Sequence, residues 1–538
     1  MASRTDATST SVPVSESAWA PLRQSLFLAI WLSSLLSYIG TWMEQVGEAW
    51  LMTSLTTSPI LVALLQSSDS LPVFLLALPA GALADIADRR RLLIFSQAWM
   101  LGAAVLLGVL TILGVITPWS LLVLTFAMGI GAALNAPAWQ ALTPELVSRA
   151  ELPAALALGS VAFNLSRSIG PALGGFVVAA VGPGVTFLLN GASFLGVLIV
   201  LYRWRRAPRT SVLPTERLVG AMKAGARYVR HAPGLRAVLV RTAGFMIGAS
   251  AVWALLPLLA RHQLNLTSVG YGVMLGCLGG GAVLGAVVLP RVRRKVSADW
   301  LLVAATLMFA FTATTLALVH SVLVVFFAMV VGGVAWMTAM TSFILGAQKA
   351  VPEWVRARGM AVFLLVFQGG MAAGSALWGA VAARAGITIA LEAAAALLVA
   401  GLGMNLRWRL GAAEGIDLTP SPVPEPIVAG TPEAEGGPVL VQIEYRIDPN
   451  QADEFIRLMQ LVKRFRRRDG AMRWALFNDA ADPARFIETY VIESWAEHLR
   501  QHDRMTRGDF EIQERARAFH LGDEPPRVTH SIGVRPSS

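Results

Sequence analysis

Long apolar runs separated by short charged gaps dominate this chain from about residue 25 to residue 408. Runs such as 59–81 and 92–115 each exceed the roughly 20 residues that a helix needs to cross a bilayer. The composition agrees, because 55% of the residues are hydrophobic and only 14% are charged, far from the usual balance of soluble domains. We therefore expect an all-α polytopic membrane protein over this region.

Twelve membrane spans are predicted, six on each side of a basic gap at residues 205–236. This 6+6 layout is typical of two pseudo-symmetric halves with a binding site between them. Apolar residues recur at helical spacing within the basic gap, so it can be an amphipathic helix on the membrane surface or a solvated linker. The predicted spans are 25–47, 59–81, 92–115, 119–140, 153–180, 183–203, 237–260, 268–290, 300–319, 321–346, 358–382 and 386–408.

The distribution of basic residues predicts the orientation of the chain. Lys and Arg crowd every second gap, whereas the intervening gaps hold only Arg261 and Arg384. By the positive-inside rule, both termini lie in the cytoplasm and the protein is a multi-pass protein of the inner cell membrane. The net charge of +10 follows from these gaps, so no nucleic-acid partner is expected. Cys277 is the single cysteine, which leaves neither a disulfide framework nor a cysteine metal site.

The charged turn after the second span carries a loop motif. Gly81 is predicted to permit close helix approach, Asp85 lies near a helix end, and Arg89 and Arg90 hold the turn on the cytoplasmic side. The turn resembles the loop signature of the major facilitator superfamily, although Asp88 replaces a glycine of that pattern. The resemblance implies the major facilitator fold and a gating role for this loop.

The fifth span carries a second motif, in which Gly170 and Pro171 precede Gly174 and Gly175. Proline removes a backbone donor and bends a helix, while glycines allow neighbouring helices to approach closely. The motif resembles one in the fifth helix of drug and metabolite exporters of the superfamily. A purely structural role and an exporter role both fit it.

Four segments resemble one branch of the superfamily, the transmembrane secretion effectors, which include the siderophore exporter of enteric bacteria. They are residues 49–51 with 55–59, 88–94, 135–142 and 351–359. The resemblance implies export of a small amphipathic metabolite, siderophore or drug, driven by the proton gradient.

Few ionisable or amide side chains lie within the spans, and each is a functional hypothesis because such a group is costly in hydrocarbon. Asp69 and Arg167 lie near mid-membrane and are predicted to carry proton and substrate coupling, although they could also form a structural ion pair. Glu44 and Glu48 are expected near the outer surface and water, at the outer end of the first span. Asn135 and Glu392 complete the predicted set.

The composition changes after residue 410. Residues 411–437 are rich in proline and predict a linker, and residues 438–538 predict a soluble module. Its strand–helix–strand–strand–helix–strand order is that of an α+β ferredoxin-like domain. The preceding parts are a cytoplasmic tail at 1–22, a six-helix half at 23–204, the connector at 205–236 and a second half at 237–410.

The soluble module resembles the antibiotic-biosynthesis-monooxygenase family of dimeric α/β barrels, through residues 493–502. The resemblance implies a pocket at Asn478, Trp495, His498 and His502, and a homodimer formed through this domain. The spacing does not reproduce the haem-degrading arrangement of some relatives, so a sensing or dimerisation role is predicted and enzyme activity is not.

We therefore predict a secondary active transporter that performs proton-coupled efflux of a small amphipathic metabolite, siderophore or drug. Its partners would be that small molecule, protons and the lipid bilayer, with no cofactor, catalytic residue or metal. Two alternatives remain, an importer of a similar compound and a membrane-tethered monooxygenase-like or sensor protein. Twelve spans with ionisable groups at mid-membrane are excessive for an anchor, which disfavours the second alternative.

Overall fold

The computed structural model divides the chain into two compact units, which are described separately. The first unit comprises Met1–Pro214, Ala243–Met340 and Leu364–Gly403, and the second comprises Thr215–Thr242, Thr341–Phe363 and Met404–Ser538. The residues that the structure describes are 19–86, 88–148, 150–204, 227–410, 417, 419, 421, 436–522 and 524–533.

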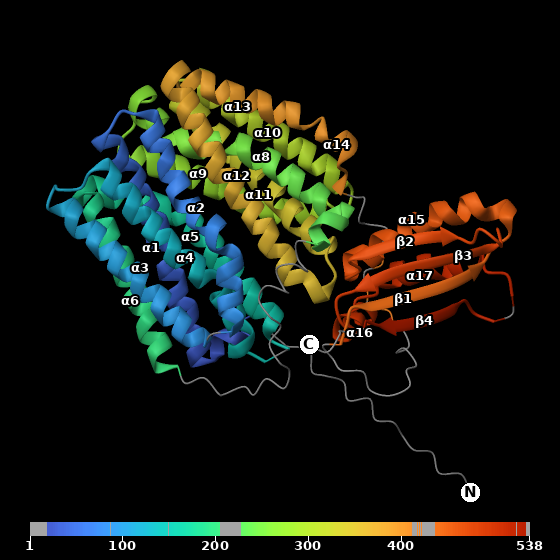
Figure 1. Ribbon diagram of the computed structural model, residues 1–538. Helices are drawn as coiled ribbons and strands as arrows, with labels where there is room; N and C mark the ends of the chain where they lie inside the picture. The colour runs from blue at the N-terminus through green and yellow to red at the C-terminus, as the bar shows by residue number, and fades with distance from the viewer. Residues whose placement is uncertain are drawn as a thin grey trace, which may run out of the picture. The chain divides into compact units, whose positions relative to one another are not determined.

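Six helices form the first half of the helical region (Figure 1). After a short 3-10 helix at Ala20–Arg23, each helix corresponds to one predicted span, although the first continues well beyond residue 47. These helices are α1 (Ser25–Leu55), α2 (Pro59–Ile86), α3 (Arg89–Ile112), α4 (Pro118–Leu146), α5 (Leu152–Val181) and α6 (Pro183–Arg203).

The second half repeats this pattern. Gly182 joins α5 to α6 with φ of 87°, and Gly386 joins α12 to α13 with φ of 92°. Glycine adopts this conformation without a steric penalty, so the corresponding turns of the two halves have the same backbone conformation. The elements are α8 (Pro233–Leu258), a π-helix (Leu259–Gln263), α9 (Ser268–Val292), α10 (Ala298–Leu318), α11 (Val322–Lys349), a 3-10 helix (Glu353–Val355), α12 (Arg356–Ala385), α13 (Ile387–Gly401) and α14 (Met404–Arg407).

Ten of the described helical segments are long and apolar enough to cross a membrane. The remaining two that match predicted spans are α5, with 30 residues and Arg167 near its middle, and α13, with 15 residues. The last span was predicted to run to residue 408, but α13 ends at Gly401 and the chain turns at 402–403 before α14. Gly401 ends α13 and Gly403 lies in this turn, and glycine weakens helix continuation there.

The predicted amphipathic connector falls mostly outside the described residues. The structure describes its last part, where residues 227–231 are helical and lead into α8. Residues 205–226 lie outside the described part of the chain, as does most of the predicted linker at 411–437.

The second compact unit joins the soluble module to residues that flank α8 and α12. Arg227 Nη2 forms an ion pair of 3.0 Å with Glu497 Oε1, and the Arg504 guanidinium lies 4.6 Å from the centre of the Trp354 ring. Tyr228 is buried between Trp354 and the carbonyl of Ala350, to which its hydroxyl donates a bond of 2.9 Å. The predicted linker suggested few contacts across this boundary, whereas charged and aromatic side chains connect the two sides.

The soluble module contains one four-stranded antiparallel sheet with strand order β2-β3-β1-β4 (Figure 1). Alternate residues of β1 and β3 are buried, so one face of the sheet packs against the helices. The predicted apolar face of α15, from Phe455 to Phe465, is buried in the same core. The elements are β1 (Val439–Arg446), a 3-10 helix (Pro449–Gln451), α15 (Ala452–Asp469), β2 (Arg473–Asn478), β3 (Arg485–Ile492), α16 (Trp495–Asp503), α17 (Arg507–Arg517) and β4 (Arg527–Ile532).

Candidate functional site

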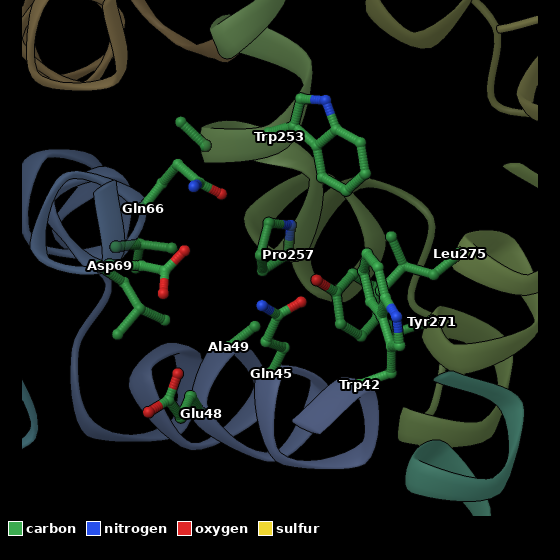
Figure 2. Close-up of a pocket in the computed structure, with 13 residues that line it drawn as sticks. Trp42, Gln45, Glu48, Ala49, Gln66, Asp69, Trp253, Pro257, Tyr271 and Leu275 are labelled. Carbon is green, nitrogen blue, oxygen red and sulfur yellow. The ribbon is translucent and has the colours of Figure 1, made fainter. Parts of the chain in front are cut away.

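A pocket lies between the two halves of the helical region, within the first compact unit (Figure 2). Residues of α1 and α2 line it from the first half, and residues of α8 and α9 line it from the second. The lining residues are Trp42, Gln45, Glu48, Ala49, Val62, Leu65, Gln66, Asp69, Trp253, Ala254, Pro257, Tyr271 and Leu275. An apolar pocket with a few convergent polar groups is typical of a small-molecule site.

The pocket has an acidic side. Figure 2 shows Asp69, from α2, and Glu48, from α1, on the same side of the pocket, with the Gln45 amide nearby. Glu48 is only 6% exposed and its Oε1 accepts a 2.8 Å hydrogen bond from the Thr125 hydroxyl of α4. Asp69 is half-buried and reaches the pocket. The predicted site residue Asp69 therefore lies in the pocket, together with a second carboxyl group.

Glu44 and Glu48 differ from expectation. The sequence placed both near the outer surface and water, but they are only 3% and 6% exposed. The Asn190 amide of α6 donates a hydrogen bond to Glu44, and Glu44 Oε1 has no hydrogen-bond partner among the described residues. The helix α1 continues to Leu55, so Glu44 and Glu48 lie inside the helix and not at its outer end. Neighbouring helices therefore surround both carboxyls.

Arg167 lies in an aromatic cluster. Its guanidinium carbon is 5.8 Å from the ring centre of Trp42 and 5.9 Å from those of Trp253 and Trp336. Arg167 is 8% exposed, and no ion pair with Asp69 occurs among the described residues. The predicted pairing of these two groups is thus replaced by cation–π contacts, because the ring faces supply the negative potential around the guanidinium.

Two other predicted site residues lie away from the pocket. Asn135 of α4 accepts hydrogen bonds of 3.2 Å from Ser96 and 3.3 Å from Gln97 of α3, so it connects neighbouring helices of one half. Glu392 is half-buried on α13, and its Oε1 has no hydrogen-bond partner among the described residues. Neither residue lines the pocket.

The glycines of the fifth-span motif do allow close helix approach. A Cβ at Gly170 would lie 2.6 Å from Trp42 Cβ, and one at Gly174 would lie 2.7 Å from Met43 Cα, both on α1. A Cβ at Gly175 would strike the Ser268 carbonyl of α9. The motif therefore brings α5 against α1 in its own half and against α9 in the other, next to Pro171.

The loop motif is described in part. Arg89 pairs with Glu145 at 2.8 Å, and Arg90 donates to the carbonyls of Leu201, at 2.9 Å, and Tyr202, at 2.6 Å, near the end of α6. Both arginines thus connect helix ends within the first half. The side chain of Asp85 lies outside the described residues.

Gly81 does not have the predicted packing role. A Cβ built at this position would meet no described atom within 4 Å. The close helix approach expected at Gly81 is therefore not present among the residues that the structure describes.

The two halves meet at the end of the helical region where α1 gives way to α2. Arg261 donates to the Trp50 carbonyl, at 3.3 Å, and to the Thr53 hydroxyl, at 3.2 Å. The Ser67 hydroxyl of α2 donates a bond of 2.8 Å to the Ala372 carbonyl of α12. Together with the α5–α9 contact at Gly175, these interactions hold the two halves in contact at this end.

The soluble module holds a cluster of aromatic and imidazole rings. The ring centre of His498 lies 4.8 Å from those of His502 and His530 and 5.2 Å from that of Trp495. The predicted residues Trp495, His498 and His502 are therefore together. Among the described residues, no group of side chains is arranged to hold a metal ion.

Asn478 does not join this cluster. Its amide donates hydrogen bonds of 3.0 Å to the Pro483 carbonyl and 3.2 Å to the Arg485 carbonyl, across the turn between β2 and β3. The prediction that Asn478 lines a pocket with the histidines is wrong, because its side chain stabilises a hairpin turn.

His498 predicts a pH-dependent stability of the module. Burial lowers its pKa to about 3, and the nearby charges of His502, His530 and Arg466 act in the same direction. The unfolded chain instead takes up a proton near pH 6.5, so the stabilisation is complete above that pH and is lost as the pH falls toward 3. At pH 5 we expect a loss of about 1 to 2 kcal/mol.

Hydrogen exchange of α16 in the full-length protein, corrected for intrinsic rates, measures this loss between pH 7.5 and pH 5. His498→Leu should remove most of the difference because the variant has no imidazole to titrate. An equal pH response in the variant and the wild type would show that another group is responsible.

Sequence reasoning missed most of the pocket. Gln45, Glu48 and Gln66 were not in the predicted site, nor were the rings of Trp253 and Tyr271. One signal was available, because Gln45, Glu48 and Ala49 recur at spacings of three and four along one face of α1. The partners on α8 and α9 are more than 180 residues away, and no local pattern relates them to α1.

Two similar helical halves with a polar and aromatic pocket between them define a membrane transporter. The chain belongs to the transmembrane secretion effector family, whose model matches residues 16–537. It is a multi-pass transporter of the major facilitator superfamily, as the resemblances in its sequence predicted.

Several relatives are named for the compounds that they move. The chain is 24% identical to the staphyloferrin A transporter of Staphylococcus aureus over 62% of this chain and 84% of that protein. It is 24% identical to the enterobactin exporter of Escherichia coli, over 52% of this chain and 67% of the exporter. It is also 22% identical to macrolide efflux protein A of Streptococcus pyogenes, over 49% of this chain and 65% of that protein.

Solved structures share the fold. A bacterial homologue of the human lysosomal transporter Spinster, in an inward-facing and occupied conformation, has a TM-score of 0.58 at 15% identity and covers 72% of this chain and 97% of its own. An inward-facing bacterial homologue of the iron transporter ferroportin has a TM-score of 0.53 at 16% identity, over 71% of this chain and 98% of its own.

Proposed function

We propose that this protein is a secondary active transporter that exports a small amphipathic compound across the inner membrane in exchange for protons. The observation that supports it most is the pocket between the halves, where Glu48 and Asp69 lie beside amide and aromatic side chains. The names of the efflux proteins among its relatives support the direction of transport. The boundaries predicted from the sequence are kept as the proposed domains, with halves at 23–204 and 237–410.

All twelve helices are proposed to span the membrane, α5 and α13 included, with both termini in the cytoplasm. In that orientation, the end at which Arg261 contacts Trp50 faces away from the cytoplasm. The halves are joined there, so the described conformation is proposed to be closed to the outside. Alternating access would then require these contacts, and the α5–α9 contact, to open.

Asp69 is proposed to carry the coupled proton. Its carboxyl is half-buried and reaches the pocket, where it can bind a proton from one side of the membrane and release it to the other. Glu48 is proposed to share this task, and Glu44 remains a candidate outside the pocket. Glu392 lies away from the pocket on α13 and is not proposed to carry the proton. Arg167 is proposed to hold Trp42 and Trp253 in place at the pocket wall.

The loop motif and the soluble module are proposed to act on conformation. Arg89 and Arg90 tie the ends of α4 and α6 to the start of α3, which would make these helices move as one body. Asp85 is proposed to hold the inner gate.

The soluble module at 438–538 is proposed to be ferredoxin-like and related to the monooxygenase family. It is proposed to form a homodimer or to sense a ligand, without enzyme activity.

A transport experiment tests the proposed function. Cells that express the protein should accumulate less of a fluorescent amphipathic drug, such as ethidium, than cells without the gene. A protonophore should remove the difference within minutes, because dissipating the gradient removes the driving force. We expect the difference in accumulation to be about tenfold, which needs only about 1.4 kcal/mol of the gradient.

The sign of the difference separates the alternatives. Higher accumulation in the expressing cells would support the importer. No difference for any of a panel of amphipathic drugs and siderophores would contradict transport of this class of compound.

A further inference from the structure

We propose that the pocket selects amphipathic organic cations and that the bound cation competes with protons for the carboxyls of Glu48 and Asp69. This inference rests on the proposed function and names its substrate class. It follows from the charges and ring faces that the lining residues present, and from the way in which Arg167 is enclosed.

The acidic side supplies the charge. Glu48 and Asp69 both line the pocket, and no cationic side chain lines it among the residues that the structure describes. The Thr125 hydroxyl donates to Glu48 and thereby orients that carboxyl from α4. A carboxylate that faces a pocket without an ion-pair partner attracts a cationic ligand, and without one it can be neutralised by a proton.

The aromatic side supplies surfaces for an organic body. Figure 2 shows Trp253, Trp42 and Tyr271 on the side of the pocket opposite Asp69 and Gln66. Ring faces carry negative potential and attract organic cations, as in the aromatic cages that hold quaternary ammonium groups. Leu275 and Pro257 add apolar contact area between these rings. The pocket therefore combines the negative charge and the ring surfaces that a flat or bulky organic monocation needs for binding.

Arg167 is a buried cation near the pocket, and its contacts explain why it does not convert the pocket into an anion site. The guanidinium contacts the rings of Trp42, Trp253 and Trp336, and Arg167 is not among the residues that line the pocket. Arginine remains charged in proteins, so its burial requires this enclosure by ring faces. An anionic ligand would instead meet the two carboxyls.

Competition with protons follows from the same geometry. The titratable and charged groups around the two carboxyls are Glu44 on α1, Tyr271 on α9, Arg167 on α5 and, beyond the Trp50 ring, Arg261 of the π-helix. Tyrosine is uncharged at neutral pH and neither arginine lines the pocket, so Glu48 and Asp69 are the charged groups that a ligand meets among the described lining residues. A bound cation favours the ionised carboxylates, and a bound proton removes the charge that holds the cation. Each cation that binds at neutral pH should therefore release protons.

Binding of two dyes of opposite charge to the purified full-length protein in lipid nanodiscs tests the proposal. Rhodamine 6G is a cation and fluorescein is an anion, and both share the same flat ring system. Fluorescence anisotropy measures each affinity without a proton gradient, and empty nanodiscs correct for partitioning into lipid. Calorimetry in two buffers of different ionisation enthalpy measures the protons released.

We expect rhodamine 6G to bind at least about tenfold more tightly than fluorescein, with release of protons. The double variant Glu48→Gln/Asp69→Asn should lose this preference and the proton release. The matched control Glu392→Gln removes a carboxyl of α13 that does not line the pocket, and it should keep both. Trp253→Leu should weaken rhodamine binding while the proton release per bound dye persists.

Tighter binding of fluorescein, or rhodamine binding without proton release, would overturn the proposal even if the double variant failed to fold. So would equal rhodamine affinity in a folded double variant and in the wild type. Because the assay contains no gradient, cation binding in a protein that shows no efflux in cells would contradict the proposed export and leave the substrate class supported.

Discussion

Asp69→Asn is expected to abolish proton-driven efflux while the protein still binds its substrate. Asparagine preserves the size of the side chain in the pocket but cannot take up and release a proton. We expect the rate of uphill efflux to fall by at least about 100-fold, equivalent to about 2.7 kcal/mol, because both carboxyls are needed for coupling and Glu48 alone does not replace the proton site at Asp69. Efflux from preloaded vesicles under an imposed pH gradient measures the rate, and rhodamine 6G anisotropy measures binding.

Glu392→Gln is the matched control, because it neutralises a half-buried carboxyl on α13 that is away from the pocket. It should pump at close to the wild-type rate. If Asp69→Asn still pumps against a gradient with the normal pH dependence, Asp69 is structural. Loss of pumping in Glu392→Gln would move the proton site to α13.

Gly272→Leu is expected to eliminate transport by separating α5 from α9. A Cβ at Gly272 would lie 2.5 Å from the Pro171 carbonyl and 3.1 Å from Gly175 Cα, so the obstructing atoms are backbone. Backbone cannot move aside as a side chain can, and overpacking of this kind typically costs about 1 to 3 kcal/mol or more. Efflux should be lost, and the thermal stability of the purified protein should fall with it.

Gly280→Leu on the same helix provides the control for this variant. A Cβ at Gly280 meets no atom of the described residues within 4 Å, so the added side chain has room. Its expression, thermal stability and efflux should remain near those of the wild type. Equal efflux in Gly272→Leu and Gly280→Leu would show that the α5–α9 contact is dispensable.

The positions of the helices could be predicted because the bilayer imposes a length and a polarity on each span. Each of the twelve predicted runs contains a helix, and Gly182 and Gly386 end the fifth and eleventh of them as expected for turns. The motif at Gly174 could be interpreted because only a glycine lets two backbones meet so closely. The strands of the soluble module followed from alternating polarity, whose period of two is visible in the sequence.

The tertiary structure decided which polar residues form the site. Glu44 accepts a hydrogen bond from Asn190, and the Arg167 guanidinium contacts the rings of three tryptophans from three different helices. Gly81, which matches the loop signature, has open space around it among the described residues. The sequence by itself determined the spans and the contrast between an apolar membrane region and a soluble module, since those depend on local composition. Which carboxyl meets which ring depends on helices that are far apart in the chain, and only their packing brings Asp69 and Trp253 to one pocket.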